Sequence, residues 1–176
     1  MNKKIFLIGI TLLTFSLSSC VLNSEFTHSG DYQKNTELSD LHLIVVGDKN
    51  TTDAMNYLGE FLTDSLLKSN IKTTKLYHCC RDKDTDMNSL IPKLLPNDYK
   101  PNSILTVVIS KVVVGAGTES SREVQLDLFD AGLQKRTWTG RVKVNMSWFV
   151  SDKNYRDVAR TLTSSIMEEL KKKKIL

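Results

Sequence analysis

The adjacent cysteines Cys79 and Cys80, which follow His78, are side chains of this sequence that could do redox or metal chemistry. A metal site would need further soft ligands, and the other histidines, His28 and His42, are distant in the sequence. A redox pair usually has the spacing Cys-x-x-Cys, and adjacent cysteines bond to each other only through a distorted peptide link. Three fates stay open for the two thiols: inert and buried, joined in a disulfide within or between chains, or bound to metal.

Other motifs that could bind an ion or activate a nucleophile are incomplete. Acidic or amide side chains occupy alternate positions from Asp82 to Asn88, as in a calcium loop, but Met87 replaces the turn glycine and Lys93 the bidentate glutamate. Gly115-Ala116-Gly117 lacks the third glycine and the following helix of a phosphate-binding loop. The sequence has no Gly-x-Ser-x-Gly motif. We therefore expect no metal, no catalytic residues and no enzymatic activity.

A third cysteine, Cys20, ends a segment that has the layout of an export signal. Lys3 and Lys4 precede an apolar run over residues 5–17, and small residues follow. A helix over this run covers roughly 20 Å, well short of the ~30 Å hydrocarbon core of a bilayer. The segment therefore fits a cleaved signal better than a permanent membrane span.

The end of this segment, Leu17-Ser18-Ser19-Cys20, resembles the lipobox of bacterial lipoproteins. The resemblance implies that the Cys20 sulfur receives a diacylglyceryl group, that a peptidase cuts between Ser19 and Cys20, and that the new amine is acylated with a fatty acid such as palmitate. Residues 1–19 would then be the signal peptide, and the lipid on Cys20 would be the covalent anchor in place of any cofactor. The alternative is an ordinary secretory signal with Cys20 incidental.

The residue after the cysteine bears on which membrane holds the anchor. Val21 stands where lipoproteins retained in the inner membrane of Gram-negative bacteria commonly have aspartate. By this resemblance we expect the outer membrane, with the protein facing the periplasm. A Gram-positive cell surface stays an alternative, because the sequence does not identify the host.

Composition limits the mature chain to one domain and a nearly neutral body. Removing residues 1–19 from the 176-residue chain leaves 157 residues, enough for one core. The formal net charge is +4, and loss of Lys3 and Lys4 leaves +2, less than the run Lys171–Lys174 alone carries. We therefore expect no nucleic-acid partner, and we interpret the lysine run as a solvated helix end.

The first part of the mature chain is polar and has no sustained apolar periodicity. Residues 20–40 are therefore predicted to form the lipidated cysteine and a flexible tether. A coil of ~20 residues has an r.m.s. reach of roughly 25 Å.

From Leu41 the pattern predicts a strand, a helix and a second strand. Leu41–Val46 is a buried strand, and residues 71–77 alternate weakly as the next. Thr51 or Thr52 can cap the helix between them, and Asn70 suits the left-handed position after it. The apolar face of this helix comprises Met55, Leu58, Phe61, Leu62 and Leu66.

The second half predicts an antiparallel meander and a closing helix. A short helix is expected around Met87–Leu95, and Ser103–Val114, apolar on both faces, is a central strand. Two more strands flank a turn at residues 130–132. Trp138 and Trp148 lie on the apolar parity of the last strand and are expected in the core. The final helix begins at Ser151 or Asp152 and has one apolar stripe: Tyr155, Val158, Ala159, Leu162, Ile166 and Leu170.

The predicted fold is α+β, in the order β-α-β-β-β-β-α, with two main helices on one face of a mixed sheet of about five strands over residues 41–176. This order resembles small lipoprotein domains of the bacterial envelope, such as the N-terminal domain of TolB and the CsgG and LpoB lipoproteins. The helix at Thr52–Ser69 between two strands and the hairpin around Asp130 carry the resemblance.

The resemblance implies a class of function rather than a reaction. We expect a membrane-anchored, periplasm-facing lipoprotein that binds another envelope component, a protein or a glycan, without catalysis, using an edge strand as a docking surface. One alternative is a redox or metal-binding protein that uses Cys79 and Cys80. A second is a surface-exposed virulence or exclusion lipoprotein. The sequence leaves the oligomeric state open.

Overall fold

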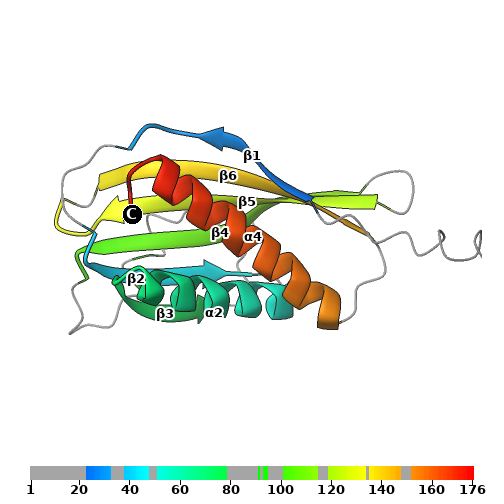
Figure 1. Cartoon of the computed structure of the whole chain (residues 1–176), viewed down its shortest axis with the longest axis horizontal. Coiled ribbons are helices and arrows are strands. Elements are labelled where there is room, and N and C mark those ends of the chain that lie inside the picture. Colours follow the sequence, from blue (N-terminus) through cyan, green and yellow to red (C-terminus); the bar gives the residue numbers. More distant parts are fainter. Residues whose placement is uncertain are drawn as a thin grey trace, which may run out of the picture.

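The structure is a computed structural model that describes residues 23–32, 38–47, 51–78, 91, 93–94, 101–114, 119–133, 135–147 and 152–176. These residues form a six-stranded mixed sheet with helices α2 and α4 packed on one face (Figure 1). The predicted α+β class, with two main helices on one face of a mixed sheet, is confirmed. Neither of these helices is long and apolar enough to cross a membrane, as far as the described residues extend.

The elements follow the predicted order after one additional strand at the start. The sheet order is β1-β6-β5-β4-β2-β3, in which β2 pairs in parallel with β3 and β4 and every other pair is antiparallel. The predicted C-terminal meander, β4-β5-β6, is confirmed. The bounds are β1 Asn23–Ser29, β2 Asp40–Val46, α2 Thr52–Lys68, β3 Lys72–His78, β4 Ser103–Val114, β5 Glu119–Asp130, β6 Lys135–Ser147 and α4 Asp152–Lys172.

Strand β1 corrects the prediction of a flexible tether over residues 20–40 and raises the expected strand number from about five to six. Its backbone pairs with β6 from Asn23 opposite Asn145 to Ser29 opposite Gly140. The sequence of β1 is polar because most of its described side chains are partly or fully exposed, and Phe26 packs against the main core. Pairing with β6 satisfies backbone groups that no side-chain pattern reveals. The domain therefore begins at β1, and not at residue 41.

The central strands are buried on both faces, as the apolar run of β2 predicts. Leu43 and Val45 face the helices in the main core, which also includes Leu58, Leu62 and Leu66 of α2. Ile44 and Val46 face the other way and pack with Ile91 in a second, smaller cluster. Asn70 adopts the left-handed conformation after α2, with φ of 61°, as predicted.

The packing between β6 and β1 depends on a glycine. Trp138 is 2% exposed, so its predicted place in the core is confirmed. A Cβ atom at Gly140 would lie 2.6 Å from Cη2 of Trp138 and 3.0 Å from Cε1 of Phe26. The absence of a side chain at Gly140 therefore lets the two rings pack across neighbouring strands.

Candidate functional site

Most of the predicted site residues lie outside the described part of the chain. These are the lipidation and cleavage residues Cys20 and Ser19 and the thiols Cys79 and Cys80; Trp148, which is expected in the core, also lies outside this part. The short helix expected at Met87–Leu95 is described only at residues 91, 93 and 94, which are helical. The predictions for these five side chains stay predictions.

The two histidines considered as metal partners are placed apart by the sheet. His28 is on β1 and His42 on β2, four strand spacings away, which amounts to roughly 19 Å. They cannot share one metal ion. Within the ranges that the structure describes, no three His, Cys, Asp or Glu side chains gather as a metal site.

His42 has a structural environment. Its side chain is buried, and Nδ1 lies 2.8 Å from Oγ1 of Thr74 on β3. Burial lowers the pKa of His42 from its ordinary value, and the negative charge of Asp40 opposes this shift. The neutral imidazole therefore links the strands β2 and β3.

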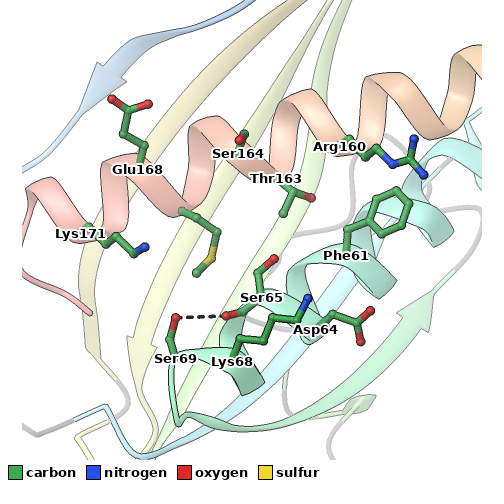
Figure 2. Close-up of a pocket in the computed structure, with 11 residues that line it drawn as sticks. Phe61, Asp64, Ser65, Lys68, Ser69, Arg160, Thr163, Ser164, Glu168 and Lys171 are labelled. Carbon is green, nitrogen blue, oxygen red and sulfur yellow. Dashed lines mark hydrogen bonds between the residues drawn. The ribbon is translucent and has the colours of Figure 1, made fainter.

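The candidate site is an open groove of about 740 Å³ between α2 and α4 (Figure 2). The helices diverge above the sheet, and small polar side chains from both point into the space between them. Serine and threonine are too short to fill it, so the groove stays open although both helices bury their apolar faces. The lining residues are Phe61, Asp64, Ser65, Lys68 and Ser69 of α2 or its end, and Arg160, Thr163, Ser164, Met167, Glu168 and Lys171 of α4.

One wall of the groove is held by two cation–π contacts between the helices. The guanidinium carbon of Arg160 lies 5.4 Å from the ring centre of Phe61, and that of Arg156 lies 4.7 Å from the ring centre of Tyr57. The two rings stack with centres 6.4 Å apart. Arg160 also forms an ion pair with Asp157, at 3.5 Å. These contacts fix the spacing of the helices at this wall.

The floor of the groove contains a buried hydroxyl. Thr163 is 7% exposed, and its hydroxyl has no hydrogen-bond partner among the residues that the structure describes. The Ser69 hydroxyl, in contrast, donates to the backbone carbonyl of Ser65, 3.1 Å away. Because the Thr163 oxygen is itself buried, this side chain belongs to the packing beneath the groove and not to the surface that a partner would reach.

The rim of the groove has charges of both signs. Lys68 and Lys171 are cationic, and Asp64 and Glu168 are anionic. None of the residues that line the groove is a histidine or a cysteine, and no serine there contacts a general base. The arrangement can form hydrogen bonds and ion pairs with a bound surface.

A second hollow of about 420 Å³ lies on the other side of α4. It is lined by Ser24 of β1 and by Arg160, Thr161, Ser164 and Ser165 of α4, so it shares two residues with the groove. Oγ of Ser24 lies 2.7 Å from Oγ of Ser165, so β1 and α4 are joined at this hollow.

The sequence predicted the apolar faces of both helices but not the groove. Its only signal was the small polar residues Ser65, Ser69, Thr163 and Ser164 beside those faces. Residues of this kind also cover ordinary solvated helix surfaces, so they become a groove only through the relative placement of the helices.

Comparisons with known proteins give fold likeness alone. No family model and no curated protein matches the sequence. The structure is similar to the lipoprotein GNA1162 from Neisseria meningitidis, with 8% identity, a TM-score of 0.48, and coverage of 76% of this chain and 99% of that chain. It is also similar to the PelC dodecamer from Paraburkholderia phytofirmans, with 10% identity, a TM-score of 0.46, and coverage of 81% and 96%.

A third similar structure is protein XCC0632 from Xanthomonas campestris, of family model DUF330, with 7% identity, a TM-score of 0.46, and coverage of 80% and 89%. At these values the likeness assigns no function. The specific resemblance to the TolB, CsgG and LpoB domains stays a prediction.

Proposed function

We propose that this chain is a lipid-anchored component of the bacterial envelope that binds a partner protein in the groove between α2 and α4 and catalyses no reaction. The observation that carries the proposal is the groove itself, which combines a rim of both charge signs with no nucleophile–base pair among its lining residues. The anchor is the lipid on Cys20, and the membrane is the outer membrane, with the domain on its periplasmic side.

The support for the anchor is the sequence Leu17-Ser18-Ser19-Cys20 after a short apolar run. Two or three acyl chains on Cys20 give stable membrane attachment, since each buried CH₂ group contributes ~0.8 kcal/mol. Replacement of Cys20 by alanine is expected to abolish fatty-acid labelling and to release the protein from the membrane fraction. An unmodified Cys20 in the mass of the purified wild-type protein would contradict the anchor.

The shape and charge of the groove favour a protein partner. Sites for small molecules are enclosed, whereas this groove is open along the helices. Charges of both signs at the rim suit a protein surface with complementary charges, and Phe61 and Met167 add apolar contact. A uniformly anionic glycan would meet Asp64 and Glu168 unfavourably.

Site-specific photocrosslinking in intact cells tests the proposal. A photoreactive amino acid is placed at Lys68, which is exposed and lines the groove but not the second hollow, and in a matched variant at Arg141, which is exposed on the opposite face of the sheet. We expect a discrete protein adduct from position 68 and none from position 141. Equal adducts from both positions, no adduct from 68, or an adduct to glycan alone would overturn the assignment of the groove.

A further inference from the structure

The first strand of the domain begins three residues after the cysteine that carries the proposed anchor. Only Val21 and Leu22 separate Cys20 from Asn23, where β1 begins. A fully extended chain advances at most ~3.6 Å per residue, so the backbone of Asn23 lies within roughly 11 Å of the lipidated residue. The chain between the lipidated cysteine and β1 is therefore too short to let the folded domain stand away from the bilayer.

Strand β1 is held in the sheet, so an anchor attached just before it restricts the position of the whole domain. Backbone pairing with β6 starts at Asn23 itself. The Ser24 hydroxyl lies 2.7 Å from that of Ser165 and 3.4 Å from the carbonyl oxygen of Thr161, both on α4. Phe26 packs against the main core. To move Asn23 relative to the sheet, the protein would have to break all of these contacts.

The direction of the strands gives the domain two distinct ends. β1 starts at the end where Glu119 of β5 pairs with Ser147 of β6, and it runs to the end where Asp130 pairs with Lys135 (Figure 1). Just beyond β1, Asp31 forms an ion pair with Lys173, 3.5 Å away. The lysine run at the C-terminal end of α4 therefore lies at the end of the domain far from Cys20.

We propose that the end of the domain at which β1 begins is seated on the lipid headgroup layer that holds the anchor, with the strands leading away from the membrane. The proposal rests on the lipid anchor of the proposed function. The hairpin between β5 and β6 and the C-terminal lysines then point away from the bilayer. The groove stands upright between α2 and α4, so its partner reaches it from the aqueous side.

This orientation places the lysine run at a distance from the membrane surface. α4 spans 21 residues, which at 1.5 Å per residue places its C-terminal end roughly 31 Å from its start. Lys171, Lys172 and Lys174 are exposed at that far end. They lie beyond several Debye lengths from the headgroup charges at physiological salt, so they do not bind the membrane that carries the anchor.

Energy transfer to the membrane surface tests the orientation. The lipidated mature protein is placed in vesicles of phosphatidylethanolamine and phosphatidylglycerol that contain a headgroup-labelled acceptor lipid. A donor dye is attached through an unnatural ketone side chain, which spares Cys79 and Cys80, either at Asn145 beside the start of β1 or at Leu133 in the far hairpin. Both positions are exposed, and β6 separates them by about 34 Å.

We expect transfer from position 145 to be several-fold greater than transfer from position 133. A variant with a ~12-residue Gly-Ser linker after Leu22, with an r.m.s. reach of roughly 20 Å, is expected to reduce this ratio toward one. Replacing Lys171, Lys172 and Lys174 by glutamine is expected to leave it unchanged. Equal transfer from both positions in the wild-type chain, or a ratio unaffected by the linker, would overturn the seating while leaving the anchor intact. Absence of lipid from the purified protein by mass would instead overturn the anchor, and the seating with it.

Discussion

The two edges of the sheet are held by different means. At one edge, β3 follows β2 in the chain through α2 and pairs with it in parallel, and α2 packs over both strands. At the other edge, β1 pairs with β6 and is joined to α4 through Ser24 and Ser165, which are 141 positions apart. One edge is thus closed by a local connection, and the other joins the start of the domain to its end.

This difference explains which edge the side-chain pattern could reveal. A strand, an amphipathic helix and a second strand in succession predict their own packing, because the connection is short and the helix must cover the strands. A polar strand whose partner lies more than a hundred residues away leaves no such pattern. The effects of mutation should differ in the same way, and we order the predictions by expected size.

The largest effect is expected where β1 and β6 meet the core. Trp138→Ala removes a buried ring beside Phe26 and should lower the free energy of unfolding by about 3–5 kcal/mol. Leu133→Ala, at an apolar side chain that is 62% exposed, is the control and should change it by less than about 0.5 kcal/mol. Denaturant unfolding measures both. Equal losses would contradict the placement of Trp138.

Alanine substitutions at two glycines allow a direct comparison of the packing near the two edges. A methyl group at Gly140 meets the rings of Trp138 and Phe26, which cannot both yield, so Gly140→Ala should destabilise the domain by about 1–3 kcal/mol. At Gly59 of α2 it meets Cδ of Lys75 at 3.0 Å, the flexible part of a long side chain, and Cγ2 of Val45 at 3.2 Å.

Gly59→Ala also gains about 1 kcal/mol of helix propensity, so its net effect should be close to zero. Thermal unfolding of the two variants measures the difference. A Gly59 variant as unstable as the Gly140 variant would show that both edges are packed with equal rigidity.

A smaller and more local effect is expected from the link between β1 and α4. Ser24→Ala removes the hydroxyl that contacts Ser165 and should cost about 0.5–1.5 kcal/mol. Hydrogen exchange should show faster opening of β1 and no change in β3. Glu25→Ala, at an exposed position of the same strand, is the matched control. If both variants opened β1 equally, the loss would reflect strand propensity and not the link.

The smallest effect on stability is expected only at acidic pH and involves the contact between β2 and β3. Because burial lowers the pKa of His42 in the folded state, the unfolded chain takes up a proton first as the pH falls below about 6.5, the ordinary value. The free energy of unfolding should therefore fall as the pH falls through this window and toward the lowered pKa. Above the window it should not depend on this group.

His42→Asn keeps a polar atom beside Thr74 and should flatten the dependence of stability on pH between about 7 and 5. His28→Asn, which removes a histidine from an exposed position on β1, is the matched control. A slope that survives in the His42 variant would assign the acid sensitivity to another group.

The elements whose burial repeats along the chain were predicted from the amino-acid pattern alone. The apolar run of β2, the helical stripe of α2, the alternation of β6 around Trp138 and the left-handed Asn70 were each readable from neighbouring residues, because periodicity and turn chemistry act locally. The α+β class and the C-terminal meander followed from the order of these elements. The signal segment and Cys20 are sequence predictions as well.

Features that depend on partners far away in the chain were not predictable from the amino-acid pattern. The residues of β1 form a strand because β6 offers an unpaired backbone edge and Gly140 leaves room for Phe26, and neither condition is visible between residues 20 and 40. The groove exists because α2 and α4 diverge over one sheet, and the separation of the lysine run from the start of β1 follows from the direction of the strands. Each results from contacts between residues about a hundred or more positions apart, which local pattern does not encode.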